Sequence, residues 1–217
     1  MSRTVIFANG VLNRPERLRR HLQPTDRIIC ADGGARHALA LGLTPDVVVG
    51  DLDSLEPAVQ KELRAAGVRF ETYPARKDET DLELAIHLAI AEGATEIDLV
   101  AVLGGRLDQS LANLMLLTRP EWAAVQLRAI EGDEIAWPGR ADETITIAGK
   151  PGDTLSLVPL THRVTGVTLE GVEWPLHQAT LRLGSTLTIS NVLTASTARL
   201  YLEEGLVLII HQVSMWS

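Results

Sequence analysis

The sequence lacks the residues that several classes of protein require. Cys30 is its only cysteine, which excludes a disulfide framework and a structural zinc site. Basic residues are also scarce, because 20 Lys and Arg stand against 28 Asp and Glu and give a net charge of −8. A protein that neutralises nucleic-acid phosphates needs a charge of the opposite sign, so we expect no nucleic-acid partner.

Long hydrophobic runs are absent as well. Segments such as residues 206–210 are far too short to span a bilayer, so we expect no membrane partner. The first ten residues have the pattern of a strand rather than of a signal peptide, which predicts a cytoplasmic protein. Hydrophobic residues make up 46% and charged residues 22%, as in an ordinary globular protein. A chain of 217 residues can bury a core in one or two domains.

Residues 1–130 alternate between short apolar segments and segments of helical composition. The predicted strands are residues 4–8, 27–31, 46–50, 68–72, 97–103 and 125–130, and the predicted helices are residues 34–42, 56–67, 80–93 and 108–119. The strands are aliphatic without polar alternation, which is typical of burial on both faces. This order predicts an α/β N-terminal domain with a mostly parallel sheet.

Residues 131–217 are rich in β-formers and lack long helical periods. The predicted strands here are residues 144–147, 154–159, 164–169, 180–183, 186–190, 198–203 and 206–213. Short strands separated by Gly and Pro predict an all-β sandwich as the C-terminal domain. We therefore expect two domains, residues 1–130 and 131–217.

Polar or glycine-rich positions follow four predicted strands of the first domain. They are Asn9-Gly10, Asp32-Gly33-Gly34, residues 50–54 and residues 104–108. In an open α/β sheet, ligands bind beyond the carboxyl ends of the strands, and glycines there let the backbone approach a ligand. Asp32 taken alone is equally typical of an ordinary turn.

Asp51 and Asp53 flank a single residue directly after an apolar strand. Two carboxylates held this close repel each other unless a cation lies between them, and hard oxygen ligands favour Mg²⁺. The alternative is an Asx-turn in which Ser54 caps the following helix. That alternative accounts for Ser54 but not for the pair of acids, so we favour a metal site.

Lys77, Asp78 and Asp81 form a third charged cluster, at the predicted start of a helix. An acid in the first helical turn would complete a metal site with Asp51 and Asp53, and Lys77 would offset phosphate charge. The helix dipole also favours acids at this position, and Asp78 or Thr80 would serve as an ordinary cap. Spacing alone does not decide between these interpretations.

Arg106 follows Gly104-Gly105 and is the candidate clamp for a phosphate, which guanidinium groups bind bidentately. Asp108 is expected to cap the next helix. The six histidines form no metal-spaced pair, and His87 is expected on an exposed helix face. Cys30 lies inside a predicted strand, where a buried, inert thiol is the expectation.

Taken together and in order, these motifs resemble the thiamine pyrophosphokinase family. The resemblance extends into the second domain through residues 171–176, which include Gly171 and Trp174, and through residues 184–191 with Ser190-Asn191. It implies a homodimer with active sites at the subunit interface. It also implies the reaction ATP + thiamine → AMP + thiamine diphosphate, with a nucleotide-binding catalytic domain followed by a thiamine-binding sandwich.

The resemblance also assigns roles to residues. Asp51, Asp53 and Asp81 correspond to the family's Mg²⁺-binding acids, and Asp32 and Asp78 to neighbouring acids of the site. On the ATP side it implies Asn9, Gly33, Gly104, Arg106 and Asp108, and on the thiamine side Thr188, Ser190 and Asn191. Gln109 stands where many members have His, which leaves its role open, and Trp174 is expected to be a core aromatic residue of the sandwich.

The acidic and basic residues named above suit the diphosphoryl transfer that the resemblance implies. Diphosphoryl transfer depends on positioning and on neutralising charge, for which Mg²⁺ on carboxylates and a basic clamp suffice. Asp78 or Asp81 is the candidate for orienting or deprotonating the hydroxyl. Two alternatives remain: a Mg²⁺-dependent phosphohydrolase that uses the same acids, and a non-catalytic module that senses thiamine or a nucleotide.

Overall fold

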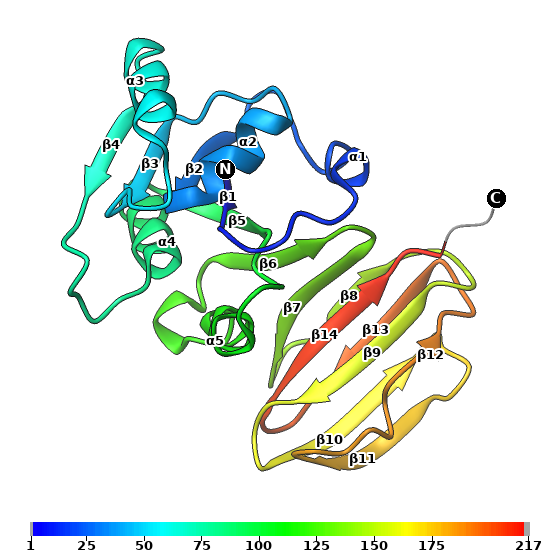
Figure 1. Ribbon diagram of the computed structural model, residues 1–217. Helices are drawn as coiled ribbons and strands as arrows, with labels where there is room; N and C mark the ends of the chain where they lie inside the picture. Colours follow the sequence, from blue (N-terminus) through cyan, green and yellow to red (C-terminus); the bar gives the residue numbers. More distant parts are fainter. Residues whose placement is uncertain (1, 215–217) are drawn as a thin grey trace. The chain divides into compact units, whose positions relative to one another are not determined.

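The computed structural model describes residues 2–214, which form two compact units divided between Gly132 and Asp133. Figure 1 shows the first unit from blue to green and the second from yellow-green to red. No helix among the described residues is long and apolar enough to cross a membrane. The predicted architecture, an α/β unit followed by a β-sandwich, is confirmed.

Unit 1 contains six parallel strands in the order β6-β5-β1-β2-β3-β4. The strands are β1 (Ser2–Phe7), β2 (Arg27–Ala31), β3 (Val47–Gly50), β4 (Arg69–Thr72), β5 (Ala94–Val100) and β6 (Gln126–Glu131). The helices are α1 (Pro15–Leu18), α2 (Ala35–Ala40), α3 (Pro57–Ala65), α4 (Asp81–Ala91) and α5 (Leu107–Leu116), with short 3-10 turns η1 (Asp32–Gly34) and η2 (Pro120–Trp122). The sequence pattern predicted neither the short α1 nor η2.

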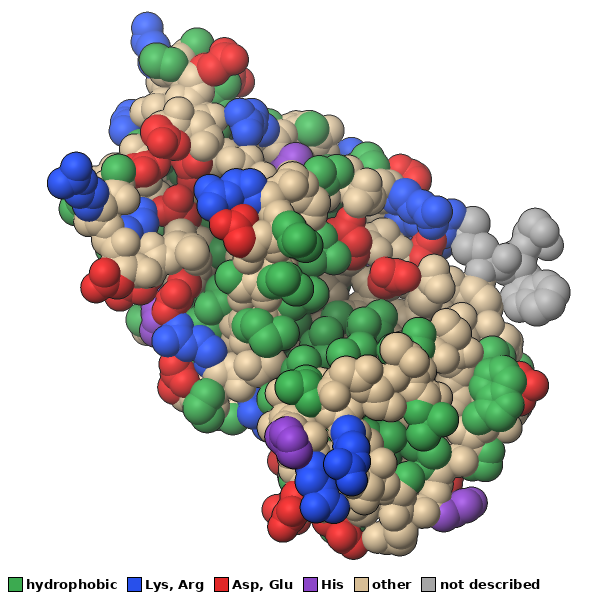
Figure 2. All heavy atoms as spheres, turned by 60° about the horizontal axis from the view of Figure 1, so that its bottom comes forward, with side chains coloured by type: hydrophobic (Ala, Val, Ile, Leu, Met, Phe, Trp, Pro, Cys, Tyr) green, Lys and Arg blue, Asp and Glu red, His purple; other side chains and the backbone are tan. Residues whose placement is uncertain are grey.

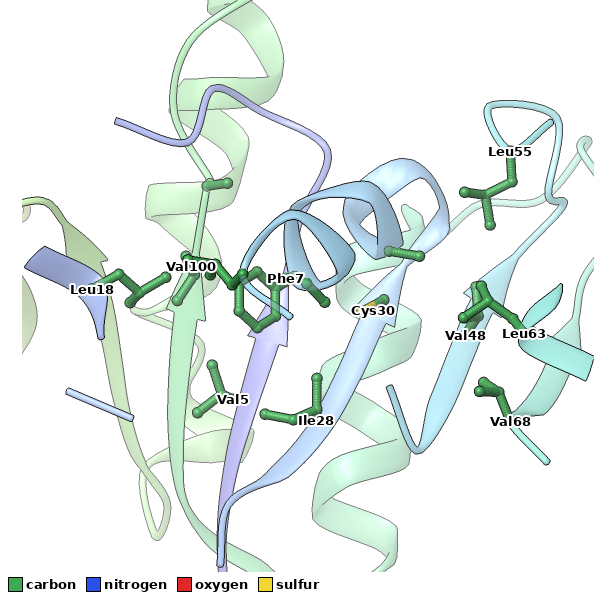
Figure 3. Packing of buried hydrophobic residues seen from close by; sticks show 14 of the residues in the cluster. Val5, Phe7, Leu18, Ile28, Cys30, Val48, Leu55, Leu63, Val68 and Val100 are labelled. Atoms are coloured by element: carbon green, nitrogen blue, oxygen red, sulfur yellow. The ribbon is translucent and has the colours of Figure 1, made fainter. Parts of the chain in front are cut away.

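Helices cover both faces of this sheet, so its central strands are buried on each side. On one face, Phe7, Cys30 and Val48 project from β1, β2 and β3 into a single apolar cluster (Figure 3). Leu63 of α3 and Ala35 and Ala38 of α2 join this cluster. Helix α4 packs against β1, β2, β3 and β5 on the other face. Burial raises the pKa of the Cys30 thiol, which confirms the expectation of an inert cysteine.

Unit 2 is a sandwich of two antiparallel sheets. The first has the order β12-β9-β14-β7 and the second β11-β10-β13-β8. The strands are β7 (Glu134–Arg140), β8 (Ile145–Ala148), β9 (Thr154–Pro159), β10 (Arg163–Glu170), β11 (Leu176–Arg182), β12 (Asn191–Val192), β13 (Thr197–Tyr201) and β14 (Leu206–Gln212). Inward side chains of both sheets, among them Leu157 and Leu200, form one shared core.

Two details of unit 2 differ from the prediction. The strand predicted at residues 186–190 is a turn, in which the Ile189 N–H bonds the Thr186 carbonyl and Ser190 adopts a left-handed φ of 61°. The apolar and β-branched residues there signalled a strand, but the chain bends before pairing. Strand β7 lies in a segment for which the sequence pattern predicted no strand.

Candidate functional site

The predicted site positions of unit 1 follow strands that are neighbours in the sheet. Asn9 follows β1, Asp32 follows β2, and Asp51 and Asp53 follow β3. The segments after β1 and β5 run side by side, because the Gly10 N–H bonds the Ala101 carbonyl at 2.8 Å. Residues distant in sequence therefore meet along the carboxyl edge of the sheet, as expected for a ligand site.

Three carboxylates gather at this edge. One oxygen each of Asp32, Asp51 and Asp53 lies within 4.8 Å of the others. Asp32 is only 6% exposed, and its buried Oδ1 has no hydrogen-bond partner among the described residues. A buried carboxylate oxygen without a donor is costly, and two further carboxylates beside it increase the repulsion. The oxygen donors and their spacing fit a hard divalent cation.

The turn that carries two of these acids is held in an unusual backbone conformation. Leu52 has a φ of 66°, and its side chain is buried in the core of unit 1. The Asp51 Oδ1 accepts the Asp53 N–H at 3.2 Å, which is an Asx-turn. Helix α3 has Glu56 as its N-cap, so Ser54 does not cap this helix as the alternative interpretation required. The Ser54 hydroxyl donates to Asp53 at 3.1 Å.

Asp81 lies beside the same cluster, in the first turn of α4. A side chain built on Gly50 would lie 3.0 Å from the Asp81 Cγ and 3.1 Å from the Asp32 Cβ, so these two acids flank Gly50. The Lys77 Nζ lies 2.5 Å from the Asp81 Oδ1. Burial raises the pKa of Asp81, Lys77 opposes this change, and the negative charges of Asp32 and Asp51 add to it.

The residue that caps the N-terminus of α4 is Thr80. Its hydroxyl accepts the Glu83 N–H at 3.2 Å. Asp78 lies in the preceding loop and is exposed. Because the cap is Thr80, neither Asp78 nor Asp81 is needed as the capping side chain. Glu83 instead pairs with Arg119, and His87 is half-exposed with its ring edge against Trp122.

The remaining positions predicted on the ATP side lie at the ends of β1, β2 and β5. A side chain on Gly33 would lie 2.5 Å from the Asn9 Oδ1, so glycine is required for this close packing. Gly104 has a φ of 85° and packs in the same way against Val11. Arg106 and Asp108 form an exposed ion pair of 2.5 Å, and the hydrogen bond from Arg106 lowers the pKa of Asp108. Arg106 itself occupies the N-cap position of α5, so the prediction of Asp108 as the cap is wrong.

Sequence reasoning missed one basic residue at this edge. Arg36, in the first turn of α2, donates from Nη2 to the Asn9 Oδ1 and from Nη1 to the Ser54 carbonyl, both at 2.9 Å. The only signal in the sequence is an arginine two residues after Asp32-Gly33-Gly34. A basic residue near a glycine-rich turn is too common to be selected without the structure.

The predicted thiamine-side residues of unit 2 differ in their accessibility. Ser190 is exposed, whereas Thr188 is buried and its hydroxyl donates to the Leu157 carbonyl at 2.6 Å. Asn191 is 5% exposed, and its amide bonds both the N–H and the carbonyl of Trp174. The Trp174 side chain is 57% exposed, so the prediction of a core aromatic residue is wrong.

Comparisons with known proteins agree with this geometry. Residues 18–129, which contain the whole acidic cluster, match the family model described as the catalytic domain of thiamin pyrophosphokinase. The chain belongs to the thiamine pyrophosphokinase family. Residues 142–207 match the model of that family's vitamin B1 binding domain, which includes Thr188, Ser190 and Asn191.

Relatives and solved structures agree with the family membership. The chain is 29% identical to thiamine pyrophosphokinase of Bacillus subtilis over 185 residues, which cover 84% of this chain and 85% of the relative. The crystal structure of thiamine pyrophosphokinase from Bacillus subtilis superimposes with a TM-score of 0.87, covering 99% of this chain and 100% of that one at 26% identity. That from Geobacillus thermodenitrificans gives 0.83 at 27% identity, covering 99% and 98%.

Proposed function

We propose that the carboxylates at the carboxyl edge of β2 and β3 hold Mg²⁺ for the family's reaction. The enzyme transfers the diphosphoryl group of ATP to the thiamine hydroxyl and so gives thiamine diphosphate and AMP. The observation that carries the metal proposal is the buried Asp32 Oδ1, which has no partner among the described residues and lies beside Asp51 and Asp53. A divalent cation bound beside Asp32 would offset the negative charge of this cluster and neutralise the phosphates.

The reaction sets requirements that these residues meet. The thiamine hydroxyl oxygen bonds the β-phosphorus of ATP, the bond from that phosphorus to the α-phosphate oxygen breaks, and AMP leaves. Charge develops on the phosphate oxygens, so fixed cationic groups accelerate the step. We propose that Asp51, Asp53 and Asp81 bind the metal with Asp32 beside them, and that Lys77 turns from Asp81 towards the phosphates.

The hydroxyl of thiamine needs an acceptor for its proton. We propose Asp78 or Asp81 for this role, because Asp78 lies in the loop just before α4 and Asp81 is the first residue of that helix. The cationic thiazolium ring of thiamine also suits an acidic wall.

On the ATP side, we propose that Arg106 leaves its ion pair with Asp108 and binds a phosphate of ATP instead. Both side chains are largely exposed, so the ion pair is weak and its rearrangement costs little. Gly33 and Gly104 allow the loops after β2 and β5 to pack tightly, which places Asn9 at the same edge. Asn9 and the backbone of these loops then supply donors to the nucleotide.

In unit 2, we propose that Ser190 contacts thiamine and that Thr188 and Asn191 hold its loop. Thr188 and Asn191 are buried and bond the backbone, whereas Ser190 points from an exposed turn. We also propose a homodimer with the site at the subunit interface, on the strength of the family resemblance. Large apolar side chains are exposed on each unit, among them Leu111 and Leu187, and Figure 2 shows such side chains open to solvent on one face.

The test is to incubate the protein with Mg²⁺, ATP and thiamine and to measure AMP and thiamine diphosphate. We expect both products in equal amounts. Asp51→Asn and Asp53→Asn should each lower turnover by about a hundredfold or more without loss of fold, because charge neutralisation at the phosphates is lost. The matched control is Asp142→Asn in unit 2, an exposed aspartate whose left-handed φ of 66° asparagine also adopts.

The alternatives predict other results. Release of phosphate without thiamine diphosphate would indicate a phosphohydrolase. Binding of thiamine or nucleotide that survives Asp51→Ala with Asp53→Ala, without turnover by the unaltered protein, would indicate a sensing module. Near-normal activity of both Asp51→Asn and Asp53→Asn would refute the assignment of these residues as metal ligands, but not the reaction itself.

A further inference from the structure

The segment of residues 51–55, which contains the turn that carries Asp51 and Asp53, is held by side chains of two helices. Its carbonyl groups accept hydrogen bonds from two long side chains of neighbouring helices. Gln60 of α3 donates from Nε2 to the Leu52 carbonyl at 3.1 Å and to the Leu55 carbonyl at 2.9 Å. Arg36 of α2 donates to the Ser54 carbonyl at 2.9 Å. A turn with a leucine in the left-handed region persists only where its surroundings hold it, and these bonds provide that support.

Arg36 differs from Gln60 because it also reaches a second loop. Its other amino group bonds the Asn9 Oδ1, which follows β1, whereas Ser54 follows β3. Strand β2 lies between β1 and β3, so the two loops are separated by two strand spacings, roughly 10 Å. Helix α2 follows β2, the middle strand, and a guanidinium with two diverging amino groups can contact both sides at once.

The position of this guanidinium is also electrostatically useful. It lies beside a turn whose two carboxylates approach that of Asp32 to within 4.8 Å, and a positive charge reduces their repulsion. Asn9 is in turn pressed against Gly33, directly after Asp32. Arg36 therefore connects the loops of three adjacent strands, with one direct bond to each outer loop and its own helix on the middle one.

We propose that Arg36 is a positioning residue that holds the metal-binding turn in a fixed place relative to Asn9, and thereby couples metal binding to nucleotide binding. This proposal rests on the proposed function of the acidic cluster. Lysine keeps the charge but offers one donor centre, which cannot bond the Ser54 carbonyl and the Asn9 Oδ1 together. The role thus depends on the fork of the guanidinium and not only on its charge.

The experiment compares Arg36→Lys with the unaltered enzyme. We expect Mn²⁺ binding to the nucleotide-free protein, followed by electron paramagnetic resonance, to weaken about tenfold, as for other residues that orient metal ligands. The KM for ATP should rise, while the KM for thiamine and the melting temperature stay unchanged. The control is Arg20→Lys, because Arg20 is an exposed arginine of unit 1 outside the site.

Asn9→Ala supplies a second measurement that does not depend on Arg36→Lys alone. In the Asn9→Ala background, Arg36→Lys should raise the KM for ATP less than it does in the unaltered enzyme, since the shared bond is already lost. Either unchanged Mn²⁺ affinity or an unchanged KM for ATP in a folded Arg36→Lys variant would overturn the proposal, and so would fully additive effects in the pair.

The two proposals fail in different ways. If Mn²⁺ binding is indifferent to Asp53→Asn, the metal site itself is wrong, whatever Arg36 does. If Mn²⁺ binding requires Asp53 but is indifferent to Arg36→Lys, only the positioning role is wrong.

Discussion

The side-chain amide of Asn191 acts as a backbone partner for Trp174. Its Oδ1 accepts the Trp174 N–H at 3.1 Å and the Val192 N–H at 2.9 Å, and its Nδ2 donates to the Trp174 carbonyl at 2.8 Å. Burial removes competing water, so these bonds fix the exposed indole on a rigid main chain. The resemblance assigned Asn191 to the lining of the thiamine pocket. Its contacts instead support an indirect role, in which Asn191 holds the main chain of Trp174 in place.

Replacing Asn191 by leucine should therefore destabilise unit 2 and weaken thiamine binding. The Trp174 N–H and carbonyl lose their partners, and each hydrogen bond lost costs about 1 kcal/mol. We expect the KM for thiamine to rise and the KM for ATP to stay constant, measured together with urea unfolding. An unchanged KM for thiamine would contradict this role. Asn191→Asp is an intermediate control, because it keeps the acceptor and loses the donor.

Among the elements, α4 has the clearest relation between sequence and structure. Its buried residues Leu82, Ala85, Ile86 and Ala89 have helical spacing and face the sheet. Thr80 begins the helix, and this start places Asp81 at the carboxyl edge beside Gly50. The cap thus serves stability and the site together.

Removal of the cap by Thr80→Ala should lower the free energy of unfolding by about 1 kcal/mol. The Glu83 N–H loses its partner, and fraying of the first turn moves Asp81, so turnover should fall as well. Thr80→Ser retains the hydroxyl and is the matched control, expected to behave like the unaltered protein in both measurements. Equal stability of the alanine and serine variants would show that the cap contributes nothing.

At the scale of the whole molecule, the two units have separate cores and each carries part of the proposed site. Metal and ATP residues belong to unit 1, and Ser190 belongs to unit 2. Helix α5 exposes a row of apolar side chains, Leu107, Leu111 and Met115, which are spaced four residues apart. None of the residues of this helix is buried. This exposure is consistent with a partner subunit.

Mixing two variants that are each impaired at low thiamine tests the proposed arrangement. Asp53→Asn disables unit 1, and Asn191→Leu impairs unit 2. If each site combines unit 1 of one subunit with unit 2 of the other, refolding an equal mixture at low thiamine should restore about a quarter of the normal activity, since half of the dimers are hybrids with one intact site. Recovery absent from a mixture that sedimentation shows to be dimeric would place each site within one subunit.

The sequence by itself determined the architecture and the family. Short aliphatic, β-branched segments that alternate with helical patterns indicate buried strands of a parallel sheet, and the acids that follow them mark its ligand edge. It failed where local signals were ambiguous: the β-branched residues 186–190 form a turn, and Trp174 is exposed rather than buried.

Tertiary structure alone decided how the charged groups combine. It placed the Asp32 oxygen, which has no donor within residues 2–214, beside Asp51 and Asp53, paired Lys77 with Asp81, and brought Arg36 between Asn9 and Ser54. These contacts depend on the lateral order of β1, β2 and β3, which joins residues far apart in the chain. Local sequence determines which groups follow each strand, but only the pairing of strands determines which groups meet.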